Sequence, residues 1–202
     1  MASSNQEIKF EDLRYTTSVA DSCALVDNFL NQQLCSSLSI NNTNIGKPVV
    51  GLAVIHIASV DKVALLQLCL NDSRCIIIQL LHLDSIPQSL KTFLADPNIC
   101  FVSVGMDDVV AKLRRDFGIE CGVSWRNLRP LDDIDFTREL LARFPNRKEL
   151  VNVLINTFSE LSIRKPKLES CSDWTVRSLS MPQIKVASMF PYLYFLVGSH
   201  FF

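Results

Sequence analysis

Glycine is scarce in this sequence, and the motifs that mark nucleotide loops and zinc sites are absent from it. Only 6 glycines occur among 202 residues, and none forms a GxGxxG or GxxxxGK loop that could cradle a phosphate. The 7 cysteines include no CxxC pair. This spacing argues against a zinc site and predicts reduced, buried thiols in an intracellular protein.

Signals for export and for membrane insertion are also missing. Residues 1–13 are polar and lack the apolar core of a secretory signal. No run of about twenty apolar residues occurs, so we expect no transmembrane helix and no membrane partner. Lys plus Arg (20) nearly balances Asp plus Glu (21), which gives no overall electrostatic signature for nucleic acid. We expect an intracellular protein, in the nucleus or the cytoplasm.

What the sequence does contain is apolar runs long enough for one well-packed domain. The hydrophobic fraction is 48%, and we expect a single domain over residues 1–202 with residues 1–7 flexible. The most apolar run, VVGLAVIHIA at 49–58, predicts a strand at the centre of the sheet, buried on both faces.

The remaining segments can be placed around this strand by their periodicity and turn residues. They predict an α/β domain with a mixed sheet, an antiparallel meander and flanking helices. We expect strands at 8–17, 49–58, 64–70, 75–81, 99–104 and 123–128, and helices at 18–38, 86–94, 107–117, 133–144 and 149–161, with a last, short helix from 181.

Several segments, taken in order and spacing, resemble the plant Werner-syndrome-like 3'-5' exonucleases. These are a DEDDy-type branch of the DnaQ-like exonucleases in the ribonuclease H-like superfamily. The resemblance implies a ribonuclease H-like fold, and cleavage of a terminal phosphodiester by two magnesium or manganese ions held by four acidic residues, with a tyrosine nearby. The matching segments are 49–52, 66–69, 79–82, 86–90, 101–105, 112–113, 165–167 and 172–174.

The sequence departs from this family at the catalytic positions themselves. Where the family reads G-L-D-V-E-W, residues 51–56 read GLAVIH, so Ala53 and Ile55 replace the Asp and the Glu. Counting back from Lys112-Leu113, the second motif's Asp falls on Val109. The last motif's tyrosine and Asp fall on Val186 and Phe190. Since carboxylates must hold the metals, we expect an inactive member of the family that needs no cofactor.

Two carboxylates leave a second interpretation open. Asp107 and Asp108 precede Val109 and could supply a metal contact if the helix shifts by one residue. They also suit the first turn of a helix, where the dipole favours negative charge. The alternative function is an active, metal-dependent 3'-5' exonuclease on DNA or RNA ends.

For a protein without catalysis the function is binding, and the sequence offers two kinds of partner. Basic loop residues are candidates for contacts with nucleic-acid phosphates, although solvated loop charge is the simpler explanation of them. These residues are Arg147, Lys148, Arg164, Lys165 and Lys167. An apolar cleft floor would instead suit a protein partner or a homo-oligomer. The aromatic C-terminus, from Tyr192 to Phe202, either completes the core or docks on such a partner.

Overall fold

The structure is a computed structural model, and it describes residues 6–10, 13–38, 47–70, 74–122, 124–128 and 172–201. The chain divides into two compact units, residues 1–127 with 174–202 and residues 128–173. Nearly all described residues belong to the first unit. The helices expected at 133–144 and 149–161 lie outside the described residues.

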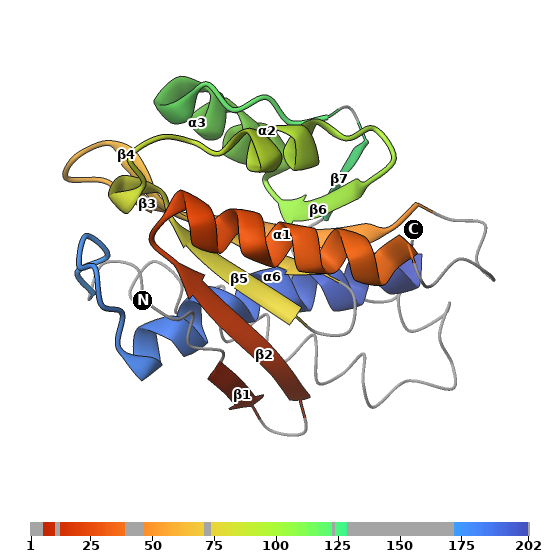
Figure 1. The fold of residues 1–202 in the computed structure, drawn as a ribbon, viewed down its shortest axis with the longest axis horizontal. Coiled ribbons are helices and arrows are strands. Elements are labelled where there is room, and N and C mark those ends of the chain that lie inside the picture. The colour runs from red at the N-terminus through yellow and green to blue at the C-terminus, as the bar shows by residue number, and fades with distance from the viewer. Residues whose placement is uncertain are drawn as a thin grey trace. The chain divides into compact units, whose positions relative to one another are not determined.

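The described strands form one mixed sheet of seven in the order β1-β2-β5-β4-β3-β6-β7 (Figure 1). The expected antiparallel meander is present, because β4 pairs antiparallel with both β3 and β5. Strand β6 runs parallel to β3, and β5 runs parallel to β2. The strands are β1 Gln6–Phe10, β2 Leu13–Ala20, β3 Val49–Ile57, β4 Lys62–Leu70, β5 Arg74–Gln79, β6 Cys100–Val104 and β7 Trp125–Leu128.

The centre of the sheet is β4 rather than β3, which corrects the expectation from apolar content alone. Every residue of β4 after Lys62 is buried, whereas β3 becomes half-buried at His56 and Ile57. The physical reason is position: β4 has two strands or more on each side, and both its faces are covered.

The N-terminal region folds into two strands where one was expected. Strands β1 and β2 pair antiparallel, and Gln6 and Glu7, which fall in the stretch expected to be flexible, pair with Thr17 and Thr16. Because β2 continues to Ala20, the following helix α1 (Cys23–Leu38) begins later than predicted.

Helices cover both faces of the sheet (Figure 1). Helices α1, α2 (Gln88–Ala95) and α3 (Met106–Phe117) contribute to one apolar cluster with the sheet. Helix α6 (Met181–Phe201) contributes to a second cluster, with Ile55, Leu65 and Ile77. A short 3-10 helix, Leu80–His82, follows β5. Among the described residues, no helix is both long enough and apolar enough to cross a bilayer.

Helix α6 is longer than predicted, because it continues through Pro191 to Phe201. Proline inside a helix removes a hydrogen bond and crowds the preceding turn. Packing on the sheet compensates: Tyr192 and Tyr194 are 4% and 3% exposed. Tyr192 and Tyr194 therefore belong to the chain's own core, as one of the two interpretations expected.

Candidate active site

Five residues stand where the resemblance places catalytic groups, and we call them the motif positions: Ala53, Ile55, Val109, Val186 and Phe190. Two of them lie on β3 and face α6. A Cβ built on Gly51 would overlap the carbonyl oxygen of Pro191, so this face of β3 lies against α6. Side chains alternate along a strand, so Ala53 and Ile55 share that face. Each is only 3% exposed.

The other motif positions lie on two different helices. Val186 packs against the same apolar cluster as Ile55, and the Phe190 ring, 5% exposed, lies 6.4 Å from that of Tyr194. Val109 on α3 is 6% exposed and belongs to the cluster of α1, α2 and α3. The structure therefore brings Ile55 and Val186 into one cluster and places Val109 in another.

These side chains do not fit the two metal ions that the resemblance implies. Magnesium and manganese are held by carboxylate and other oxygen ligands, and the motif positions offer none from their side chains. Within the described parts of the chain, no three or more His, Cys, Asp and Glu side chains come together as a metal site would require. Asp107 and Asp108, the two acidic residues that precede Val109, form hydrogen bonds with other side chains.

Asp107 and Asp108 are bound to neighbouring polar groups. Lys112 donates to Asp108 over 2.7 Å, one helical turn away. Asn127 Nδ2 donates to Asp107 over 2.9 Å, while Asn127 Oδ1 accepts the N–H of Met106 over 2.6 Å. Asn127 is thus a cap for the start of α3 that sequence reasoning missed, because it lies 20 residues from Asp107. No local pattern could have revealed it.

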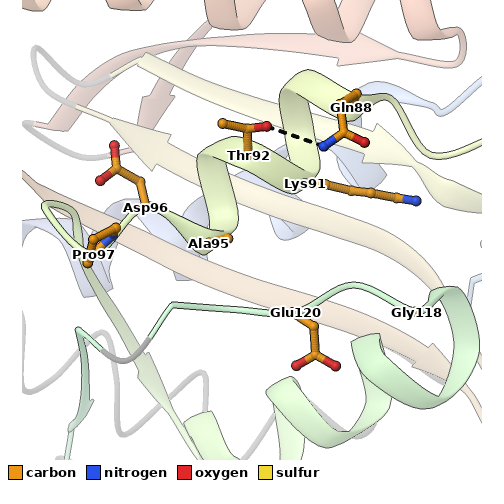
Figure 2. Close-up of a pocket in the computed structure, with 8 residues that line it drawn as sticks. All are labelled: Gln88, Lys91, Thr92, Ala95, Asp96, Pro97, Gly118 and Glu120. Carbon is orange, nitrogen blue, oxygen red and sulfur yellow. Dashed lines mark hydrogen bonds between the residues drawn. The ribbon is translucent and has the colours of Figure 1, made fainter.

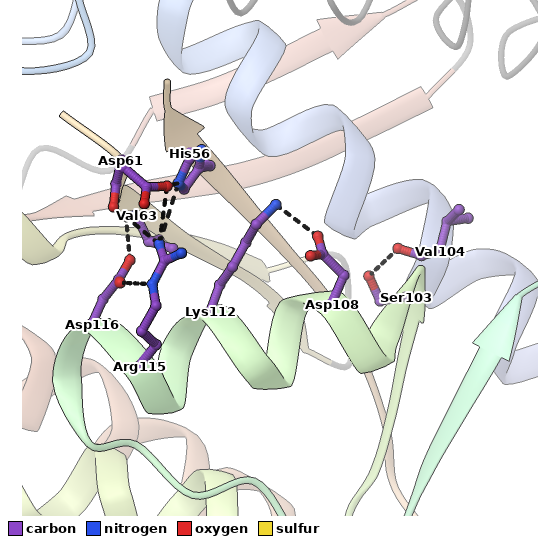
Figure 3. Close-up of polar contacts among 9 residues, drawn as sticks. All are labelled: His56, Asp61, Val63, Ser103, Val104, Asp108, Lys112, Arg115 and Asp116. Atoms are coloured by element: carbon purple, nitrogen blue, oxygen red, sulfur yellow. Dashed lines mark hydrogen bonds and ion pairs between the residues drawn. The ribbon is translucent and has the colours of Figure 1, made fainter. Parts of the chain in front are cut away.

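A second polar group joins the end of α3 to the turn between β3 and β4 (Figure 3). We call it the α3–turn network, and it consists of His56, Asp61, Arg115 and Asp116. His56 Nε2 lies 3.0 Å from Asp61 Oδ1, and Arg115 Nη2 donates to the Asp61 carbonyl over 3.0 Å. Apart from the charged residues themselves, no sequence pattern predicts this network, since Arg115 and Asp61 are 54 positions apart.

Asp116 is the covered member of this network, with a side chain 5% exposed. It accepts from Arg115 Nε over 2.6 Å and from the Val63 N–H over 2.8 Å. Burial by itself acts to raise the pKa of Asp116, but the hydrogen bonds from Arg115 and Val63 outweigh it and hold the pKa below its ordinary value. Asp116 therefore fastens β4 to α3.

A groove of about 500 Å³ lies elsewhere on the first unit (Figure 2). One wall is the exposed side of α2 and the residues that follow it, and the other is the segment after α3. None of the motif positions lines it. Its lining residues are Gln88, Lys91, Thr92, Ala95, Asp96, Pro97, Gly118 and Glu120.

The remaining predicted residues divide between the packed core and the undescribed part. Trp174 is 3% exposed and belongs to the cluster on the α6 side. The nucleic-acid-binding candidates lie outside the described residues: Arg147, Lys148, Arg164, Lys165 and Lys167.

Known proteins of similar sequence and structure are nucleases. No protein-family model matches the chain. A 3'-5' exonuclease of Arabidopsis thaliana is 25% identical over 128 residues, which cover 63% of this chain and 41% of that protein. The chain thus spans about two fifths of the length of this curated relative.

Solved structures of the EXD2 exonuclease domain are similar over most of the chain. The domain soaked in magnesium is 22% identical with a TM-score of 0.51, and 91% of this chain and 87% of that chain are covered. The domain soaked in manganese is 22% identical with a TM-score of 0.50, covering 91% of this chain and 88% of that chain. This chain has an exonuclease-domain fold.

The exonuclease-domain fold confirms the predicted ribonuclease H-like architecture, with its central mixed sheet and flanking helices. The sequence similarity to a 3'-5' exonuclease agrees with the resemblance at the level of exonuclease domains. The assignment to the plant Werner-like branch, and the loss of catalysis through the motif positions, stay predictions.

Proposed function

We propose that this chain is a Werner-type 3'-5' exonuclease-like domain that does not hydrolyse phosphodiesters and acts by binding. The observation that carries the proposal is the state of the motif positions, which are all apolar. Ala53, Ile55, Val109 and Phe190 are at most 6% exposed, and Val186 is half-buried. Hydrolysis by two metals requires carboxylates that clamp the attacking and leaving oxygens. Apolar side chains at these positions supply no such ligands.

Burial also bears on the kind of partner. An exposed apolar cleft would have favoured a protein partner, but Ala53, Ile55 and Phe190 are each at most 5% exposed. In the described part of the chain, the large apolar side chains that are exposed are Val60 and Met181. We therefore propose nucleic acid as the first partner to test, with a protein chain or a second copy as the alternative. A nuclear or cytoplasmic location fits either partner.

For nucleic-acid binding we propose the basic residues at 147–148 and 164–167. The basic side chains on α3 are less suitable, because Lys112, Arg114 and Arg115 each form an ion pair with a neighbouring carboxylate. A phosphate would have to displace that carboxylate. Contacts between basic side chains and the phosphates of the nucleic acid would make binding independent of base sequence and strongly dependent on salt.

The alternative is an active metal-dependent 3'-5' exonuclease, which the identity to the Arabidopsis protein favours. It would need metal ligands at new positions, for which Asp107, Asp108 and Asp61 are the candidates. Each of them already has a polar partner. Metal binding would therefore have to break these contacts.

The deciding experiment is digestion of 3'-end-labelled oligonucleotides, single-stranded and recessed duplex, with magnesium and then manganese. The natural chain is compared with one carrying Ala53→Asp, Ile55→Glu, Val109→Asp and Phe190→Asp. We expect the natural chain to leave both substrates intact. Cleavage by the natural chain that stops with a chelator would refute the proposal, and Asp107→Asn and Asp108→Asn would then locate the ligands.

Binding is measured separately by fluorescence anisotropy with the same oligonucleotides at increasing salt. We expect Lys165→Glu with Lys167→Glu to weaken binding at least tenfold and to flatten its salt dependence. A control with the same change in net charge is Arg74→Glu with Lys185→Glu, two exposed cations outside the proposed contacts. An equal loss in the control would assign the effect to net charge, and no binding by the natural chain would favour the protein partner.

A further inference from the structure

Gln67 is a polar side chain in the most buried strand of the sheet. It lies in the middle of β4 and is 1% exposed. Its Nε2 atom is buried and has no hydrogen-bond partner. A buried donor left unpaired destabilises a fold, and such groups are rare in native proteins. This one therefore requires a physical explanation.

The pairing of β3 with β4 shows which side chain Gln67 faces. Gln67 is the cross-strand partner of Ala53 in the antiparallel ladder. Its neighbours two positions away, Leu65 and Cys69, both belong to the apolar cluster on the α6 side, so Gln67 points to the same face. Side chains directly opposite each other have Cβ atoms about 4.5–5.5 Å apart. The unpaired amide thus lies within side-chain reach of position 53.

Ala53 cannot use this donor, because a methyl group accepts no hydrogen bond. A neighbouring amide does not use it either. Gln79 on β5 lies diagonally across the same face and has a buried, unpaired Oε1, while its Nε2 donates to the Val176 carbonyl over 2.9 Å. If the two amides reached each other, the Gln67 donor and the Gln79 acceptor would both be paired.

We propose that Gln67 is a positioning residue whose side-chain N–H would orient an oxygen-bearing side chain at position 53. Gln67 is thus the donor half of a carboxylate site, and Ala53 lacks the acceptor half. A carboxylate there would accept the Gln67 N–H and would be held in one orientation on the face of β3. Gln67 would touch neither substrate nor metal, so its role is to orient another group. Residue 53 is the motif position whose partner the sheet still provides.

The test is a double-mutant cycle on the full chain, read by urea unfolding at pH 7 and pH 4. Ala53→Asp is made with Gln67 present and again together with Gln67→Met, which keeps the side-chain length but removes the donor. Ala53→Asp should increase the equilibrium constant for unfolding in both backgrounds. The increase should be about tenfold smaller with Gln67 than with Gln67→Met. The coupling should be smaller at pH 4, because a protonated carboxyl is a weaker acceptor.

Two further substitutions separate a hydrogen bond from packing. Ala53→Val adds volume without an acceptor, and its effect should be the same within twofold in both backgrounds. Ala53→Asn supplies a neutral acceptor, and its coupling with Gln67 should be about threefold. It takes the place of Ala53→Asp in the cycle if the Ala53→Asp variant does not fold. The inference would be overturned if Ala53→Asp and Ala53→Asn both coupled to Gln67 by less than twofold. It would also be overturned if Ala53→Val coupled to Gln67 as strongly as they do.

A titration of the new carboxyl by carbon NMR gives a second readout that packing alone would not move. Its pKa should lie about one unit lower with Gln67 than with Gln67→Met, since the donor favours the charged form. Both measurements read folding and protonation rather than cleavage. If the natural chain cleaves DNA, the proposed function fails while this inference stands, and an absent coupling leaves the proposed function untouched.

Discussion

The motif positions carry no charge, whereas the α3–turn network is built from charged side chains. Ile55, Val186 and Val109 pack in apolar clusters, Ala53 and Phe190 are buried, and none of these motif positions is charged. The α3–turn network contains charged side chains bonded to one another, with Asp61 largely exposed and Arg115 about half exposed. Charge is retained where a partner or water stabilises it. It is absent where a carboxylate would be buried without a metal ion to neutralise it.

The difference teaches what the apolar substitutions achieve for the fold. Carboxylates that converge in a buried site repel each other, and each is costly to remove from water. Apolar residues at those positions avoid this cost and extend the core. In the α3–turn network, Asp116 shows the opposite solution, because Arg115 and the Val63 N–H hold the carboxylate in its charged form.

The largest effect is expected from introducing one charge at a motif position. Ile55→Glu should reduce the free energy of unfolding by about 3–5 kcal/mol at pH 7, because the new charge is buried and unpaired. Burial raises the pKa of such a carboxyl, so the loss should shrink as the pH falls and the group becomes protonated. Urea unfolding between pH 4 and pH 8 measures this. Ile55→Leu is the control, and an equal cost would show that shape rather than charge is responsible.

A smaller effect is expected where α6 touches β3. A Cβ at Gly51 would overlap the Pro191 carbonyl oxygen and lie 2.6 Å from Phe195 N, so Gly51→Ala forces the helix backbone outward. We expect a loss of about 1–3 kcal/mol. Gly198→Ala is the control, because its Cβ would meet Val102 and Val49 side chains, which yield more easily. Thermal melts compare the two, and a milder effect at Gly51 would contradict this packing.

Removing the covered charge of the α3–turn network should cost less again. Asp116→Asn should reduce the free energy of unfolding by about 1–2 kcal/mol at pH 7, because a neutral acceptor replaces a charged one. The native pKa of Asp116 is lowered, so its contribution is present above the unfolded-state pKa and is lost as the pH falls through the folded pKa. Wild type and variant should converge in acid. A constant difference at all pH values would assign the effect to packing.

The smallest effect is expected for an exposed ion pair on the same helix. Arg114 binds both carboxylate oxygens of Glu120 over 2.6–2.9 Å, yet both side chains are about three-fifths exposed. Solvent and salt screen such pairs. Glu120→Gln should leave the urea midpoint unchanged within error in physiological salt. A clear loss there would mean that exposed and covered ion pairs stabilise this fold alike, which would weaken the comparison.

The sequence predicted the elements of the sheet better than their order. The runs in β3, β4 and β5 were recognisable because each is apolar, short and separated by polar turn residues. Helix α3 was predicted at 107–117 from its apolar periodicity, and the structure places it at Met106–Phe117. Gly105 and Gly118 stand at its two ends with positive φ values of 68° and 61°. The pairing of β1 with β2 was not predicted, because nothing local distinguishes two short strands from one long strand.

The candidate site shows the same division. The identity of the motif positions followed from the sequence once the segments were aligned with the resemblance, since Ala53 and Ile55 stand at fixed distances from Gly51. The length of α6 was misjudged because Pro191 is a helix-breaking signal in isolation. Packing against the sheet overrides that signal, as the buried Tyr192 and Tyr194 indicate.

By itself the sequence determined the apolar character of the motif positions and the periodicity that builds an α/β sheet. Only the tertiary structure decided which face each residue shares and which partner each polar group finds. The reason is distance along the chain: Asp116 bonds Val63 across 53 positions, and Ala53 faces Gln67 only because β3 and β4 pair in that register. Such contacts depend on the whole sheet, and no local pattern encodes them.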